Sequence, residues 1–107
     1  MKDKARYYLE DLINRYPSLK GCEQDIERAF NVMVEVFSSG GKMLVCGNGG
    51  SAADSEHFIG ELIKSFIKRR EISPEEKAKF DKFGEDGKYI ASRLQGALPA
   101  ISIAFRT

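Results

Sequence analysis

The sequence of 107 residues has no tryptophan, one histidine and only two cysteines. Two cysteines, Cys22 and Cys46, are too few for a disulfide framework, and this favours a reducing cytoplasm. Positive and negative charges nearly cancel, with 17 lysines and arginines against 16 aspartates and glutamates. A formal net charge of +1 gives no overall field that would hold the chain on nucleic acid or on an anionic membrane. We therefore expect no direct nucleic-acid partner.

Long apolar runs are missing as well. No stretch approaches the ~20 consecutive apolar residues that a membrane-spanning helix needs. The N-terminal sequence MKDKARYYLEDL is charged and amphipathic, unlike a signal peptide. We therefore expect a soluble, cytoplasmic protein with no membrane partner.

Enough apolar side chains are present for the chain to fold, because hydrophobic residues make up 42% of it. In residues 1–41 they recur at the three- and four-residue spacing of two amphipathic helices. Pro17 ends the first helix, and paired glycines at 40 and 41 end the second. The two apolar stripes are Ala5, Tyr8, Leu9, Leu12, Ile13 and Tyr16, and Ile26, Ala29, Phe30, Met33 and Phe37.

A strand, a loop and a helix are expected next. Residues 42–46 form a short apolar run between glycines, typical of an interior strand in which Cys46 packs as a small hydrophobe. Residues 47–50 predict a tight loop. Ser51, with an acid three residues later, matches a helix N-terminus, and the apolar pattern continues this helix to about Ile67.

Another helix start follows a patch of mixed charge. Ser73 as the cap and Pro74 at the first helical position predict a helix that reaches Phe83. Residues 86–87 (Asp-Gly) predict a turn, and residues 89–94 predict a short helix.

Residues 100–105 have the pattern of a second strand. Because residues 47–99 separate the two strands, we expect a parallel pair joined by a crossover rather than a hairpin. Two parallel strands do not form a stable sheet alone. The fold class is therefore α/β, the N-terminal part of a doubly wound parallel sheet preceded by two amphipathic helices. Residues 1–41 would form the helical pair, and residues 42–107 the first βαβ portion of a larger domain that is truncated after its second strand.

The loop of residues 47–51 (Gly-Asn-Gly-Gly-Ser) is the first candidate site. Glycines let backbone N–H groups approach a ligand, and the helix N-terminus behind them presents unpaired donors and a positive dipole end. Asn48 and Ser51 add side-chain hydrogen bonds, so the loop suits an anion or a polyhydroxylated ligand. The alternative is a structural turn in which glycine supplies a positive φ and Ser51 only caps the helix.

Gly47, Gly49 and Ala52 also fit the dinucleotide-binding pattern G-x-G-x-x-G/A. That pattern requires an acid about 20 residues further on, at the end of the second strand. Here the second strand begins only at Ala100 and no acid follows it, so a dinucleotide cofactor is disfavoured.

The helix after the loop carries the second candidate site. At about 100° per residue, Ile59, Leu62 and Phe66 point away from the polar arc of this helix. His57 and Glu61, four residues apart, can ligate one divalent metal, and a carboxylate beside a sugar can move a proton between adjacent carbons. The alternative is a solvated face with a hydrogen bond between these two side chains. The residues of the polar arc are Asp54, His57, Glu61 and Lys64.

Residues 46–62 (CGNGGSAADSEHFIGEL) closely resemble the signature of the sugar isomerase (SIS) domain family, in its phosphoheptose isomerase branch. Residues 94–105 (LQGALPAISIAF) look like the second strand of the same flavodoxin-like proteins. The two N-terminal helices suit that branch, in which they build the oligomer. The resemblance covers nearly the whole chain but only about the first half of a family domain. Ser65 stands where members often carry arginine, and the segment 68–93 is longer than in the best-known isomerases.

The resemblance implies an intramolecular oxidoreductase that isomerises sedoheptulose 7-phosphate to D-glycero-D-manno-heptose 7-phosphate, a precursor of lipopolysaccharide. It implies an enediol mechanism with Glu61 and His57 as catalytic residues and as ligands of a divalent metal, zinc. It also implies a homotetramer with sites near subunit boundaries, completed by a phosphate-binding loop and by a glutamine and a histidine on a C-terminal helix. The implied sugar contacts are Asn48, Gly49, Gly50, Ser51 and Glu61.

A second hypothesis comes from the same resemblance. Some SIS proteins are non-catalytic adaptors of the bacterial replication initiator, and others sense sugar phosphates to regulate transcription. The near-zero net charge disfavours direct DNA binding and leaves a protein partner open. Presence of the glutamine and the histidine on the last helix would favour the isomerase.

Overall fold

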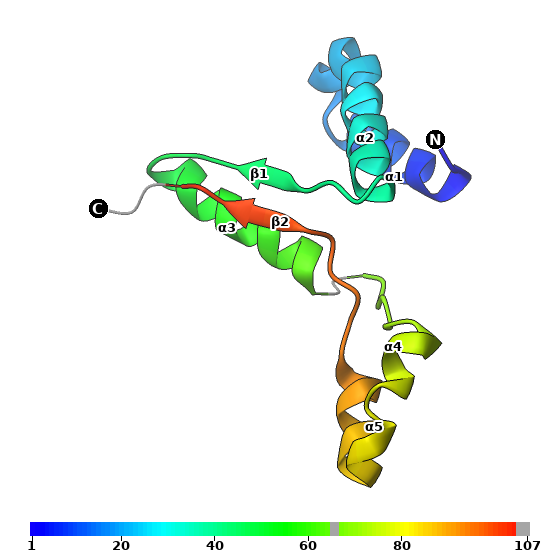
Figure 1. Cartoon of the computed structure of the whole chain (residues 1–107). Helices are drawn as coiled ribbons and strands as arrows, with labels where there is room; N and C mark the ends of the chain where they lie inside the picture. The colour runs from blue at the N-terminus through cyan, green and yellow to red at the C-terminus, as the bar shows by residue number, and fades with distance from the viewer. Residues whose placement is uncertain (65–66, 105–107) are drawn as a thin grey trace. The chain divides into compact units, whose positions relative to one another are not determined.

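The computed structural model describes residues 1–64 and 67–104. The chain divides into two compact units, Met1–Gly41 and Lys42–Thr107 (Figure 1). In the part of the chain that is described, no helix combines the length and the apolar character that a membrane crossing requires.

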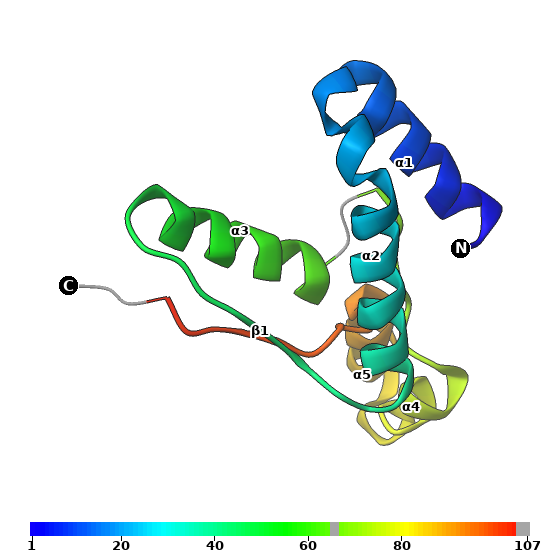
Figure 2. The ribbon, with the colours of Figure 1, turned by 90° about the horizontal axis from the view of Figure 1, so that it is seen from above.

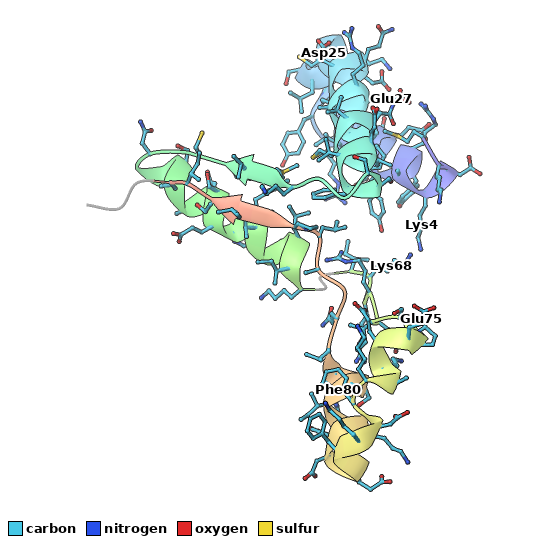
Figure 3. The ribbon with its side chains drawn as sticks, in the orientation of Figure 1. Lys4, Asp25, Glu27, Lys68, Glu75 and Phe80 are labelled. Carbon is cyan, nitrogen blue, oxygen red and sulfur yellow. The ribbon has the colours of Figure 1, made fainter. Side chains whose placement is uncertain are left out.

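The first unit is helical. It contains α1 (Asp3–Arg15), the 3-10 helix η1 (Pro17–Cys22) and α2 (Glu23–Ser38), so both predicted helices are confirmed. Leu9 and Ile13 of α1 are buried. Arg6 on α1 pairs with Glu27 on α2 at 2.7 Å, and Figure 3 labels Glu27. After α2, Gly40 turns the chain in the left-handed region, with φ of 77°.

The second unit contains a two-stranded parallel sheet, as the sequence predicts. Strand β1 (Met43–Val45) pairs with β2 (Ala100–Ser102). Both strands are shorter than the predicted runs 42–46 and 100–105, and Phe105 lies outside the described residues.

One helix, α3 (Gly50–Ile63), lies along this sheet (Figures 1 and 2). Ser55 and Ile59 are its buried residues. Alternate strand residues are half-buried, whereas Leu44 is 58% exposed and Ile101 51% exposed on the other face. The alternation shows that, among the described residues, α3 covers one face of the sheet.

Two predictions about this region are wrong. Cys46 is exposed rather than buried, because it lies beyond Val45, the last paired residue of β1. Helix α3 ends at Ile63 instead of Ile67, and Phe66, predicted for its apolar face, lies outside the described residues.

Between α3 and β2 the chain forms a helical segment of α4 (Pro74–Ala78), the 3-10 helix η2 (Asp81–Phe83) and α5 (Gly84–Arg93). Ser73 and Glu76 form a capping box at the start of α4, and Pro74 follows the cap, so this predicted helix start is confirmed. The helix is shorter than predicted, because α4 ends at Ala78 rather than at Phe83.

The predicted turn at residues 86–87 is wrong, because Gly87 lies inside α5 and is buried. A Cβ at Gly87 would lie 2.1 Å from the carbonyl oxygen of Phe80, so glycine is needed here for close packing rather than for a turn. Figure 3 labels Phe80 within this segment. The turn falls instead at Gly84, where φ is 64°.

Candidate functional site

Two glycines of the loop after β1 are required by the fold, for different reasons. A Cβ at Gly47 would lie 2.3 Å from the backbone oxygen of Ser51, closer than a real Cβ can approach. Gly49 has φ of 53°, in a region that L side chains rarely adopt. A Cβ at Gly50, in contrast, would meet nothing within 4 Å. Gly47 and Gly49 therefore shape the loop, and space is open beside Gly50.

Ser51 closes this loop with its side chain. Its hydroxyl donates to the backbone oxygen of Asn48 at 2.7 Å and accepts from the Asn48 backbone N–H at 2.8 Å. The predicted N-cap at Ser51 is wrong, because α3 begins at Gly50 and its N-cap is Gly49, without a side-chain cap. The Ser51 hydroxyl is thus occupied within the loop, while the side chain of Asn48 is exposed to solvent.

The first turn of α3 also uses several of its own donors. The backbone N–H of Ser51 donates to the oxygen of Asn48 at 3.0 Å, and that of Ala52 donates to the oxygen of Gly49 at 3.2 Å. Ser55 donates its hydroxyl to the backbone oxygen of Ser51 at 2.8 Å. Two backbone donors at the start of α3 are therefore occupied locally.

Further along α3, His57 and Glu61 lie together as the sequence predicts. His57 Nε2 is 3.4 Å from Glu61 Oε1. The His57 side chain is 79% exposed, whereas that of Glu61 is 32% exposed. Glu61 Oε2 is buried and has no hydrogen-bond partner among the described residues. A buried carboxylate oxygen without a partner is unfavourable, so this atom is poised to accept a hydrogen bond, a proton or a metal.

An open cavity of about 400 Å³ lies over this part of α3. Glu61 and His57 form part of its wall, and Lys64 supplies a cation at one end. Polar groups of both signs beside an opening of this size suit a small polar ligand rather than an apolar one. The lining residues come from α3 and its C-cap, Lys64: Ala53, Glu56, His57, Gly60, Glu61 and Lys64.

The predicted site residues thus fall into two groups. Asn48, Gly49, Gly50 and Ser51 lie in or next to the loop at the start of α3, and none of them lines the cavity. At 1.5 Å per residue, Glu61 lies about 15 Å along the helix axis from Ser51. Asp54, predicted on the same arc as His57, is exposed and does not line the cavity either.

A metal centre would need more ligands than this pair. Within residues 1–64 and 67–104, no group of three or more histidine, cysteine or acidic side chains is placed to hold a metal ion. The imidazole of His57 and the unpartnered oxygen of Glu61 are donors that zinc accepts. These two residues therefore fit half of a four-coordinate site.

Three residues of the cavity wall were missed by the sequence reasoning. Ala53 lies four residues before His57 and Gly60 three residues after it, on the same helix face, and Glu56 directly precedes His57. That spacing was the available signal, and it was applied only to the polar residues of the arc. Gly60 matters most, because a Cβ there would meet nothing within 4 Å, and its absence widens the cavity.

Known proteins match both parts of the chain. The SIS domain family matches residues 7–101. A probable phosphoheptose isomerase of Thermoplasma volcanium is 55% identical over 49 residues, which are 46% of this chain and 25% of that protein. A phosphoheptose isomerase of Rhodospirillum rubrum is 35% identical over 74 residues, 69% of this chain and 39% of that protein.

A phosphoheptose isomerase of Helicobacter pylori is 37% identical over 57 residues, which are 52% of this chain and 30% of that protein. The chain thus spans a quarter to two-fifths of the length of these curated relatives. No solved structure matches it significantly. Because the family match extends over most of its length, this chain belongs to the SIS domain family.

Proposed function

We propose that this chain is part of a phosphosugar isomerase that converts sedoheptulose 7-phosphate to D-glycero-D-manno-heptose 7-phosphate. The observation that carries the proposal is the buried, unpartnered Oε2 of Glu61 beside His57 in the wall of a polar cavity. The names of the relatives support this substrate, and membership of the SIS domain family supports a sugar phosphate in general.

In the reaction, Glu61 acts as the base. A proton leaves C1 of the ketose, next to the carbonyl at C2, and an enediol forms as the C2 oxygen gains a proton. A proton then returns at C2 while the C1 hydroxyl loses its proton, which leaves an aldehyde at C1. A carboxylate that lines a cavity and has one unpartnered oxygen suits such a transfer between adjacent carbons.

The other residues bind and orient the sugar. His57, largely exposed beside Glu61, is in reach of sugar hydroxyls and of the developing oxyanion. Asn48 offers a solvent-exposed side-chain amide, and the open space beside Gly50 lets a ligand approach the backbone. We also propose Gly49 and Ser51 as part of this sugar-binding loop, with Ser51 acting mainly by holding Asn48.

A divalent metal, zinc, fits this site. His57 and Glu61 would supply two of its ligands, and further ligands would come from outside the described residues. When bound, the metal would stabilise negative charge on the sugar oxygens.

The experiment uses protein expressed from the complete reading frame. Glu61→Gln removes the base but keeps the side-chain shape, so we expect kcat for heptose isomerisation to fall by about 10²–10⁴-fold. Asp54→Asn is the matched control, because Asp54 is an exposed acid of the same helix outside the cavity. Isomerisation by Glu61→Gln at the wild-type rate would refute the role of Glu61. Sugar-phosphate binding without turnover in the wild type would instead favour the sensor or adaptor.

The metal has a separate test. We expect zinc to co-purify with the wild-type protein and to be lost from His57→Ala, as measured by elemental analysis of folded protein. Equal zinc contents in the two proteins would remove His57 from the ligand set.

We also propose that the protein is a cytoplasmic homotetramer assembled through Met1–Gly41. Both cysteines are free, in agreement with a reducing compartment. An apolar groove of about 250 Å³ opens between α1 and α2, and Val32 and Tyr7 are well exposed on these helices. Light scattering on the complete protein should give the mass of a tetramer, and a monomeric mass would refute this proposal.

A further inference from the structure

The C-terminal end of α3 is held by one arginine from outside the helix. Arg70 Nη2 donates to the backbone oxygen of Leu62 at 2.6 Å and approaches that of Lys64 at 3.4 Å. Arg70 Nε donates to the backbone oxygen of Gly96 at 3.0 Å. The side chain is half-buried. A single guanidinium therefore joins the end of α3 to the segment that leads into β2.

Backbone hydrogen bonds close the same junction. The N–H of Gly96 donates to the oxygen of Arg70 at 2.6 Å, and Glu71 pairs with Gln95 in an antiparallel bridge. The N–H of Leu98 donates to the oxygen of Leu62 at 2.9 Å, so this carbonyl accepts from two donors. We call these contacts of Arg70, Gly96 and Leu98 the clasp.

The clasp acts on carbonyl groups that a helix cannot satisfy by itself. The last four carbonyls of an α-helix lack intrahelical partners, and helix ends fray when nothing else binds them. Helix α3 ends at Ile63, and its last backbone hydrogen bond runs from the N–H of Lys64 to the oxygen of Gly60. A cation beside these carbonyls also complements the negative end of the helix dipole.

Glu61 lies in this last turn, directly before Leu62. If the turn frayed, the Glu61 carboxylate would lose its fixed direction in the cavity wall. His57 stands one turn earlier, and its contact with Glu61 at 3.4 Å depends on both residues keeping helical geometry. The candidate base is thus on the part of α3 that depends most on contacts from elsewhere in the chain.

We propose that Arg70 is a positioning residue for isomerisation: by holding the final turn of α3 it fixes the Glu61 carboxylate against the substrate. The inference rests on the proposed function. It also links the α4–α5 segment to the site, because the clasp closes the two ends of that segment.

The test compares Arg70→Ala, Arg70→Lys and Arg69→Ala in the complete protein. Arg69 is the matched control: it carries the same side chain and donates to the backbone oxygen of Ser92, away from α3. Misplacement of a catalytic group by about 1 Å can cost about 10²-fold in rate, so we expect kcat of Arg70→Ala to fall about 10- to 100-fold. KM should stay within about threefold, since the misplaced base and not ground-state binding limits the reaction.

Arg70→Lys should recover part of kcat, because lysine can donate to Leu62 but cannot bridge to Gly96 as well. Wild-type kcat in Arg70→Ala, or an equal loss in Arg69→Ala, would overturn the inference. The inference would also be overturned if Arg70→Ala lost its fold, with kcat falling and KM rising by the same factor, and if Arg70→Lys recovered none of the activity. If the wild type itself does not isomerise sugar phosphates, the proposed function fails, and that result is distinct from an active wild type that is insensitive to Arg70.

Discussion

The two ends of α3 are stabilised in opposite ways. At the N-terminal end, Ser51 bonds to Asn48, three residues away, and Ser55 bonds to Ser51. At the C-terminal end, Leu62 receives its donors from Arg70 and Leu98, which lie beyond the helix. The loop end is therefore determined by its own short sequence, and the end that carries Glu61 depends on distant segments. Substitutions at the two ends of α3 should therefore differ in their effects on stability and on ligand binding.

The largest effect is expected at Gly47. In Gly47→Ala the new Cβ would collide with the backbone oxygen of Ser51, and backbone has little room to shift. We expect the free energy of unfolding to fall by about 2–4 kcal/mol, measured by urea denaturation. Gly50→Ala is the control, because nothing lies within 4 Å of a Cβ there, and it should change stability by less than about 1 kcal/mol. Equal losses in both variants would contradict the close approach at Gly47.

Removal of the Ser51 hydroxyl should have a smaller effect. Ser51→Ala deletes two hydrogen bonds to the Asn48 backbone, so we expect a loss of about 1–2 kcal/mol in the free energy of unfolding. Ser92→Ala removes one exposed hydrogen bond to the Tyr89 oxygen within α5 and should be nearly neutral. If Ser51→Ala were equally neutral, the loop would not be held by this side chain.

At the other end of α3, Gly60→Ala should separate stability from binding. The Cβ meets nothing within 4 Å, and alanine favours the helix by about 1 kcal/mol over glycine. We therefore expect a rise in thermal midpoint together with weaker binding of the sugar phosphate, since the methyl group enters the cavity. Calorimetric titration of Gly60→Ala would show this loss. Unchanged affinity would mean that the ligand does not occupy this cavity.

The smallest effect concerns Glu71, which pairs with Gln95 next to the clasp. A hydrogen bond from Lys77, aided by the charges of Lys77 and Arg69, lowers the pKa of Glu71 below its ordinary value. A lowered folded-state pKa contributes stability above the unfolded pKa that is lost as the pH falls through the folded value. We expect Lys77→Met to raise the Glu71 pKa in an NMR titration, with Lys79→Met as the control. An unchanged pKa would show that the pair does not persist in solution.

Sequence reasoning succeeded where structure is set by neighbouring residues. The two N-terminal helices and the pairing of His57 with Glu61 depend on spacings of three or four residues, and the helix start at Ser73 and Pro74 depends on adjacent residues. The parallel pairing of β1 and β2 followed from the length of the connection.

It failed where one specific contact, rather than residue type and spacing, decides the local structure. Gly87 looked like a turn residue, but it lies in α5, where the Phe80 oxygen leaves no room for a Cβ. Ser51 looked like a cap, but its hydroxyl turns back to Asn48. Arg70 gave no signal at all within the basic run of residues 68–70, because its partners are carbonyl groups, which every residue has.

The most direct measurement of the role of Glu61 is proton exchange at the reacting carbons. Wild-type protein and Glu61→Gln, both from the complete reading frame, would be incubated with sedoheptulose 7-phosphate in D₂O and followed by NMR. We predict that the wild type incorporates deuterium next to the carbonyl and that Glu61→Gln does so about 10²–10⁴-fold more slowly. Deuterium incorporation by Glu61→Gln as fast as by the wild type would contradict the assignment of Glu61 as the base.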